Sequence, residues 1–217
     1  MQPERLKEAK KRGKERNAKV DRNLNRIRAI AVVGTPGVGK TTLCSHLKRK
    51  YGYDHVDVGQ LVKRERLYRR YDSNRKTYIA DIPRLEKEIS KVLHEARSNL
   101  VLIDGSYAHD LVPRKPWVGI FLIRLNPVLL YRRLAEEYGR LKAKENSIAE
   151  FLGVIPSELV GLKNVVEVDA SDRDISQMET IFRRSLKNGF KGRTRFKNWT
   201  AEMKENETRR YLRVVEN

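Results

Sequence analysis

The chain has 217 residues, enough for one well-packed core with some length left for extensions. It carries 47 Lys and Arg against 28 Asp and Glu, and the net charge of +19 favours a polyanionic partner, with nucleic acid ahead of a membrane. No apolar run approaches the roughly 20 residues of a membrane span, and no apolar segment follows the basic N-terminus, so neither a spanning helix nor a secretory signal is expected.

The single cysteine, Cys44, has no partner for an internal disulfide and no neighbours at metal-ligand spacing. We therefore expect a reducing, cytoplasmic location, with Cys44 acting as a small buried apolar side chain.

The positive charge is concentrated at the two ends of the chain. Residues 1–28 hold eleven Lys and Arg against four Asp and Glu, and residues 187–217 hold nine against four. We therefore divide the chain into a basic N-terminal extension (1–28), a core domain (29–186) and a basic aromatic tail (187–217). The extension is either a solubilising segment or an arm that contacts RNA phosphates. The tail aromatics either stack on bases or pack back onto the core.

Strands alternate with helices along the core. Largely apolar runs predict strands at 30–33, 100–104, 117–125 and 165–168, and the stretch 53–58 is predicted as a further short strand. Helices are expected at 42–48, 59–70, 83–96, 126–138, 142–152 and 175–186, with a loop at 71–78. This alternation is typical of an α/β fold, in which helices cover both faces of a five-stranded parallel sheet.

A phosphate-binding loop follows the first strand. The residues Gly34-Thr35-Pro36-Gly37-Val38-Gly39-Lys40-Thr41 match G-x-x-x-x-G-K-[ST] between a strand and a helix, and Thr42 comes next. Glycines let consecutive amides point at an anion, and the helix adds its positive dipole end. Lys40 is expected to reach the β- and γ-phosphates of ATP, while the Thr41 hydroxyl holds Mg²⁺. This loop is the core of the predicted ATP site.

Asp104 ends the apolar strand at 100–104. A carboxylate at the carboxyl end of a buried strand is where nucleotide-binding proteins of this kind hold Mg²⁺ through water. An Asp before a Gly such as Gly105 also commonly initiates a turn. The prediction that Asp104 holds Mg²⁺ therefore depends on the presence of the loop at 34–41.

Several short stretches after the loop carry a resemblance to a known family. They are His55-Val56-Asp57-Val58-Gly59-Gln60-Leu61, Leu67-Tyr68-Arg69-Arg70-Tyr71-Asp72, Ile103-Asp104-Gly105, Ile123-Arg124, Tyr131-Arg132-Arg133-Leu134 and Lys144-Glu145-Asn146. Over about residues 29–186 the chain resembles the adenylate-kinase-like P-loop family of small-subunit ribosome assembly factors, found in archaea and eukaryotes.

The resemblance implies a nucleoside-monophosphate-kinase-like architecture, with an acceptor segment at about 59–82 and a lid at about 138–150. It implies ATP as donor with AMP-type acceptors, ATP hydrolysis, and association with ribosomal RNA and the platform ribosomal protein uS11. It places Lys40 and Asp104 in catalysis and adds Arg124 to the ATP site, and because the family's lid arginine is Glu137 here, Arg133 or Arg140 would have to supply the catalytic cation. The implied acceptor residues are Asp57, Gly59, Lys63 and Tyr71, and His109 could replace the family's His only if the loop geometry brings it to the site.

The chain departs from the family pattern at four positions. Ser106 stands where the family has a His two residues after the strand-end Asp, and Gln60, Lys63 and Glu137 replace an acid and two arginines. Ser cannot carry a proton near neutral pH as His can, and Lys lacks the bidentate fork of Arg. We therefore expect an ATP-binding assembly factor with slow kinase or ATPase activity. A housekeeping nucleotide kinase and a nucleotide-binding RNA scaffold are the alternatives.

Overall fold

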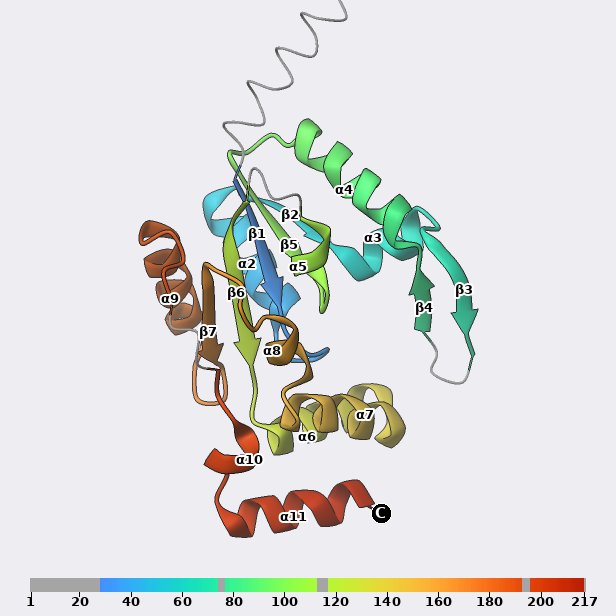
Figure 1. Ribbon diagram of the computed structural model, residues 1–217, viewed down its shortest axis with the longest axis vertical. Coiled ribbons are helices and arrows are strands. Elements are labelled where there is room, and N and C mark those ends of the chain that lie inside the picture. The colour runs from blue at the N-terminus through green and yellow to red at the C-terminus, as the bar shows by residue number, and fades with distance from the viewer. Residues whose placement is uncertain (1–27, 74–76, 113–116, 193–195, 217) are drawn as a thin grey trace, which may run out of the picture.

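Five parallel strands form the centre of the protein, in the order β2-β5-β1-β6-β7 (Figure 1). The computed structural model describes residues 28–73, 77–112, 117–192 and 196–216, so the expected N-terminal extension lies outside the described residues except for Arg28. The strands are β1 Arg28–Val33, β2 Asp54–Asp57, β5 Leu100–Asp104, β6 Trp117–Arg124 and β7 Val165–Asp169. The predicted five-stranded α/β fold is confirmed.

Strand β1 lies at the centre because its side chains are apolar on both faces. Ala29 to Val33 are all fully buried, as expected for a parallel strand covered on two sides. Its register pairs Val32 with Asp104 of β5, so the end of β5 lies beside the start of the phosphate-binding loop. The adjacency of these two strands therefore brings the two predicted site elements together.

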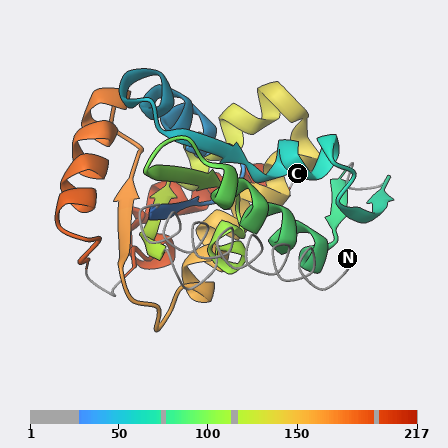
Figure 2. The ribbon, with the colours of Figure 1, turned by 90° about the horizontal axis from the view of Figure 1, so that it is seen from above.

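Helices cover both faces of the sheet, as Figure 2 shows from above. One face is covered by α2 Lys40–Tyr51, α6 Pro127–Tyr138, α7 Arg140–Phe151 and α9 Ile175–Lys187. The other is covered by α3 Val58–Arg64, α4 Ile82–Glu95, α5 Ala108–Leu111 and α8 Val154–Glu158. The alternation of side chains along β1 supplies both cores, with Ile30 in one and Ala31 in the other.

The predicted helix at 59–70 is confirmed only in its first half, and the predicted loop at 71–78 missed the strands on either side of it. Helix α3 ends at Arg64, and β3 Tyr68–Asp72 pairs antiparallel with β4 Thr77–Ala80. Arg66 takes a left-handed conformation with φ of 51°, which ends the helical path. Tyrosine rings then hold the hairpin together, since Tyr78 lies with its centroid 4.6 Å from that of Tyr68. Aromatic cross-strand contacts outweigh the helical pattern here.

The C-terminal segment packs onto the core. Phe190 is fully buried, with ring centroids 6.1 to 6.4 Å from those of Phe182 and Phe121. Beyond it, α10 Trp199–Glu202 and α11 Glu205–Glu216 lie against α6 and α7 (Figure 1). Of the two interpretations of the tail aromatics, packing onto the core holds for Phe190 and Trp199. In the part of the chain that the structure describes, every helix is too short or too polar to cross a membrane.

Candidate active site

The phosphate-binding loop joins the end of β1 to the start of α2, which begins at Lys40. Gly34 has φ of +147°, and a Cβ there would lie 2.4 Å from the carbonyl oxygen of Ile123. Only glycine allows that close approach of the loop to β6. Gly39 precedes the helix with φ of +104°, again a conformation that side chains rarely adopt. These glycines let the loop curl at the N-terminus of α2, where free backbone amides can bind an anion.

Lys40 is held inside the loop. Its Nζ donates hydrogen bonds to the carbonyl oxygens of Gly34 (2.8 Å) and Thr35 (3.1 Å), and the residue is 8% exposed. Burial lowers the pKa of Lys40 to about 8, and the nearby carboxylate of Asp104 opposes that shift. An anionic phosphate in the loop would act in the same direction as Asp104 and favour the charged ammonium.

The pair of residues predicted to hold Mg²⁺ comes together. The Thr41 hydroxyl donates to Oδ1 of Asp104 at 3.3 Å. Hydroxyl and carboxylate oxygens are the hard ligands that Mg²⁺ prefers, and the ion usually keeps several of its waters. Thr41 and Asp104 therefore suit Mg²⁺ at the mouth of the loop.

Residue His55 was not predicted as a site residue, although it stands in the stretch that carried the family resemblance. Its Nε2 lies 2.6 Å from Oδ2 of Asp104, and the side chain is 8% exposed. The parallel pairing of β2 with β5 places His55 opposite Leu102, on the strand that Asp104 ends. Sequence alone had no signal for this pairing, because the two residues are 49 positions apart.

A cavity of about 500 Å³ opens beside the loop. Its walls come from the loop, from the end of α6, and from the segment between β7 and α9. The lining residues outside the loop and α2 are Leu125, Arg133, Glu137, Tyr138, Ala170, Arg173, Asp174, Ile175 and Met178. The apolar Ile175 and Met178 offer a surface for a nucleotide base. Sequence reasoning missed this wall. The one sequence clue to these residues is that they follow the last parallel strand, since ligands in such sheets bind at the carboxyl ends of the strands.

Of the two predicted catalytic arginines, one lies at the loop. Arg133 donates from Nη1 to the carbonyl oxygen of Gly37 at 2.8 Å and lines the cavity. Arg140 lines a different cavity, beside Arg213 of α11. Glu137 faces the phosphate-loop cavity together with Tyr138. Arg133 is thus placed to offset the carboxylate of Glu137, whereas Arg140 is not.

A second cavity of about 390 Å³ lies where the acceptor was expected. It is lined by Thr41, Ser45, Lys48, His55, Val56, Asp57, Gln60, Leu61, Arg64 and Val92. Asp57 caps α3 by accepting a hydrogen bond from the amide of Gln60 at 2.9 Å. Lys48 and Arg64 bring positive charge to this cavity, and neither was predicted.

The other predicted acceptor residues are more scattered. Gly59 is exposed in the first turn of α3. Tyr71 belongs to the β3–β4 hairpin, with its ring centroid 4.9 Å from that of Tyr78, and the Lys63 ammonium lies 5.9 Å from the same ring. His109 lies on α5 with its side chain 2% exposed and its Nε2 3.7 Å from a Glu158 carboxylate oxygen. It lines neither of the two cavities.

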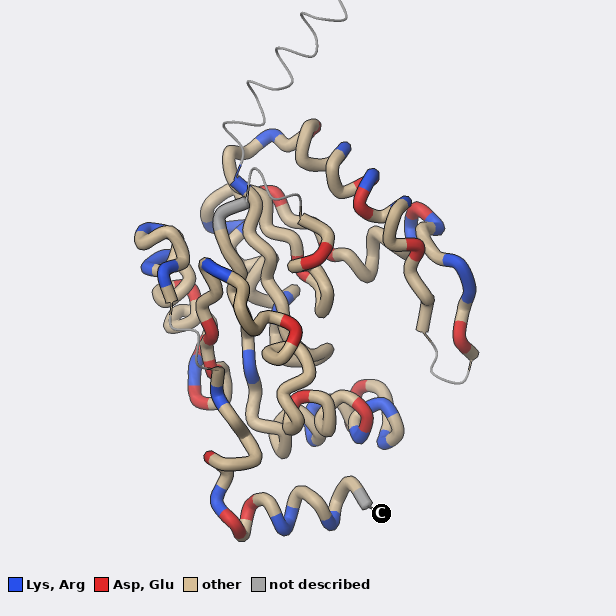
Figure 3. The backbone as a smooth tube through the Cα atoms, viewed as in Figure 1, with Lys and Arg blue, Asp and Glu red and all other residues tan. Residues whose placement is uncertain are grey.

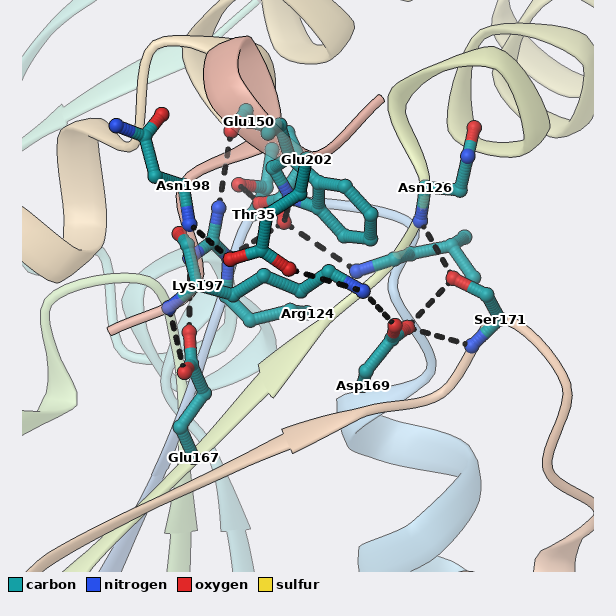
Figure 4. Close-up of polar contacts among 12 residues, drawn as sticks. Thr35, Arg124, Asn126, Glu150, Glu167, Asp169, Ser171, Lys197, Asn198 and Glu202 are labelled. Atoms are coloured by element: carbon teal, nitrogen blue, oxygen red, sulfur yellow. Dashed lines mark hydrogen bonds and ion pairs between the residues drawn. The ribbon is translucent and has the colours of Figure 1, made fainter. Parts of the chain in front are cut away.

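Arg124 is engaged inside the protein (Figure 4). It is fully buried, and its guanidinium donates to Glu150 at 2.6 Å and to Glu167 at 2.9 Å. Glu150, on α7, also accepts a hydrogen bond from the Thr35 hydroxyl of the phosphate-binding loop at 2.6 Å. The assignment of Arg124 to ATP is therefore wrong for this arrangement, since its charge is already matched by two carboxylates.

Cys44 is buried, as the sequence predicted. Its sulfur lies within 4.8 Å of ligand atoms of His55 and Asp104. Burial raises the pKa of the Cys44 thiol well above its usual range, with the Asp104 carboxylate acting in the same direction. A protonated thiol is a poor metal ligand. We therefore treat Cys44 as a packing residue of α2.

The fold and the loop define a P-loop protein with kinase-like architecture. A family model described as "AAA domain" matches residues 30–153. The protein named "Putative adenylate kinase" of Methanocaldococcus jannaschii is 35% identical over 150 residues, which cover 69% of this chain and 80% of that protein. A protein of the same name from Thermococcus onnurineus is 30% identical, covering 80% and 92%. This chain belongs to the adenylate-kinase-like family of P-loop proteins.

Solved structures agree at the level of the fold. Shikimate kinase from Acinetobacter baumannii, solved in complex with shikimate, superposes with a TM-score of 0.51 at 14% sequence identity. The match covers 75% of this chain and 94% of that one. At this identity the likeness concerns the P-loop kinase fold alone.

Proposed function

We propose that the protein is an ATP- and Mg²⁺-dependent nucleoside-monophosphate kinase with an AMP-type acceptor, and that it also hydrolyses ATP slowly. The observation that carries this proposal is that Thr41 lines both cavities. One cavity contains the phosphate-binding loop and the other contains the acceptor segment. A γ-phosphoryl group at Thr41 would therefore lie between donor and acceptor, as in-line transfer requires.

The residues of the loop have separate roles in this reaction. Lys40 and the loop amides hold the β- and γ-phosphates, and Arg133 at Gly37 supplies a cation for the charge that develops on the transferred group. Thr41 and Asp104 hold Mg²⁺, which neutralises phosphate charge when bound. An acceptor phosphate oxygen attacks the γ-phosphorus, the bond to the β-phosphate oxygen breaks, and ATP with AMP becomes two ADP.

The acceptor side supports slow turnover. Gln60 lines the acceptor cavity where the resembling family has an acid, and Lys63 faces the hairpin. Lys48 and Arg64 are the cations that line this cavity, and Arg64 already pairs with Glu65 at 2.9 Å. A loosely held acceptor leaves room for water as the attacking group, so ADP and inorganic phosphate form as a side reaction.

Steady-state ADP formation tests this proposal. Wild-type protein with ATP, Mg²⁺ and AMP should form ADP with only a minor release of inorganic phosphate, and with ATP alone it should release phosphate more slowly than it forms ADP with AMP. Lys40→Ala should abolish both reactions, with Lys48→Ala as the matched control that weakens only the AMP-dependent one. Turnover within the usual kinase range of about 1–100 s⁻¹ would favour a housekeeping kinase over a slow enzyme. Wild-type protein that binds ATP without turnover would favour the scaffold alternative.

We also propose a role in maturation of the small ribosomal subunit. The support is the family resemblance of residues 29–186 and the net charge of +19, which suits an RNA-rich partner. A nucleotide panel assay with and without small-subunit ribosomal RNA and a uS11-type protein tests it. Stimulated ATP turnover, lost in Lys40→Ala, supports the role. Unchanged turnover together with no co-sedimentation on small subunits contradicts it.

A further inference from the structure

A cavity of about 620 Å³ lies at the amino ends of the strands, away from the phosphate-binding loop. It is lined by Arg28, Tyr53, Arg183, Arg184, Leu186 and Lys187. Arg28 begins β1 and the loop follows its other end, so the two sites are separated by a strand of six residues, about 20 Å. We call these six residues, with Tyr51, the basic–aromatic surface.

The aromatic part of this surface is already ordered. The rings of Tyr51 and Tyr53 stack with centroids 5.4 Å apart and an interplanar angle of 23°. The guanidinium of Arg183 lies 5.1 Å from the Tyr51 ring on α2. The Tyr51 hydroxyl donates to Glu179, which fixes the ring. Tyr53 is half-buried at the end of this stack and lines the cavity. A planar group could extend the stack there with little loss of side-chain entropy.

The cations of the surface have few acidic neighbours. Within the described residues, Arg28, Arg184 and Lys187 are exposed and form no ion pair. Glu179 is the one acidic residue of α9, and Lys50 and His46 already bind it. Figure 3 shows the blue segments of α9 toward the C-terminal end of this helix. The cations in the last turn of α9 also interact favourably with the negative end of its helix dipole. This interaction does not account for Arg28 or for the stacked tyrosines, which belong to other elements.

We propose that the basic–aromatic surface binds single-stranded nucleic acid. The exposed cations can bind the phosphates of a strand. An unpaired base can stack on the ring of Tyr53 and so extend the aromatic stack. Charge alone would serve a lipid surface or a duplex equally well, whereas a tyrosine ring at the end of an ordered stack favours a flat unpaired base over a base pair buried in a duplex. The 27 residues that precede Arg28 hold ten Lys and Arg against four Asp and Glu, so the sequence continues the positive charge.

This proposal does not depend on phosphoryl transfer. One of the two interpretations of the tail placed base stacking on its aromatics, but the structure buries Phe190 and Trp199. The exposed end of the stack is instead Tyr53, between α2 and β2. The surface would bind a single strand even if the protein did not turn over ATP. Likewise, the protein could turn over ATP even if the surface bound no strand.

Fluorescence anisotropy of the full chain with short labelled strands of RNA and DNA tests the proposal, with salt varied from about 50 to 200 mM. Tyr53→Ala should weaken binding about tenfold with an unchanged salt slope, because stacking is not ionic. Tyr53→Phe keeps the ring and should bind like wild type. The double variant Arg184→Glu/Lys187→Glu should weaken binding and lower the log–log salt slope by about 1.4.

The matched control is Lys87→Glu/Lys204→Glu, which changes the net charge equally with exposed lysines elsewhere. It should bind nearly as well as wild type. ATP binding, measured separately, should be unchanged in all four variants and so reports their folding. Equal losses in the control, no loss in Tyr53→Ala, or equal affinity for duplex and single strands would overturn the proposal. Binding to phosphatidylserine vesicles that depends on Tyr53 would overturn it in favour of a membrane.

Discussion

His55 Nε2 lies 2.6 Å from Oδ2 of Asp104, and both side chains are almost completely buried. The resembling family places an imidazole two residues after this Asp, where the present chain has Ser106. The Ser106 hydroxyl instead donates to the carbonyl oxygen of Gly34 at 3.2 Å. In this chain the imidazole at the strand-end carboxylate therefore comes from the neighbouring strand β2.

His55→Ala is expected to lower ATP turnover by about 10- to 100-fold, because Asp104 loses the partner that orients it toward Mg²⁺. The apparent Mg²⁺ requirement should rise, while the affinity for ATP without metal should stay the same. His55→Gln keeps a side-chain hydrogen-bond donor and should recover part of the loss. Mg²⁺ titrations of turnover check this. Equal turnover in His55→Ala and wild type would show that His55 only packs.

Arg133→Ala should reduce phosphoryl transfer by about 10³-fold, the effect of losing a cation that stabilises the transferred group. Arg140→Ala should change transfer little, because Arg140 lines the cavity beside Arg213 rather than the one at Gly37. The two variants remove the same charge from neighbouring helices, so each controls for the other. Single-turnover measurements with enzyme in excess over ATP decide between them. The reverse ranking would show that α7 turns Arg140 toward the phosphates during the reaction.

Local sequence patterns predicted most of the fold. The five strands followed from apolar runs, and the loop at 34–41 from glycine spacing, because both signals are short-range. The β3–β4 hairpin was missed because Tyr68 and Tyr71 stabilise it through contacts with Tyr78, on another strand. A helical pattern of apolar residues cannot show such cross-strand contacts.

The candidate site was predictable where it is contiguous and less so where it is assembled. Thr41 and Asp104 met as expected, since the ends of parallel strands share one edge of the sheet. Arg124 was misassigned because its partners, Glu150 and Glu167, are 26 and 43 residues away. Long-range pairing decides whether a cation faces a ligand or the interior, and one sequence does not reveal it.

Glu150→Ala is expected to lower the free energy of unfolding by about 3–5 kcal/mol, because Arg124 would lose one carboxylate inside the core. The Glu150 carboxylate accepts hydrogen bonds from Thr35 (2.6 Å), Arg124 (2.6 Å) and the Trp199 indole (3.1 Å). Urea denaturation followed by circular dichroism gives the change, and Glu86→Ala on exposed α4 is the control. A loss below about 1 kcal/mol would mean that Glu167 alone neutralises Arg124.

Glu179 ties α9 to the end of α2, and its contribution to stability should depend on pH. Hydrogen bonds from Lys50, Tyr51 and His46 lower the pKa of Glu179 to about 2. In the unfolded chain the pKa of a Glu is near 4.3. The native state therefore favours the ionised form, so this stabilisation is fully present above about pH 4.3 and is lost as pH falls toward 2.

Glu179→Gln should lower the Tm at pH 6, and its difference from wild type should shrink between pH 4 and pH 3. Glu86→Gln, exposed on α4, is the control and should follow wild type. A Tm difference that stays constant over this range would show that Glu179 stabilises the protein without its charge.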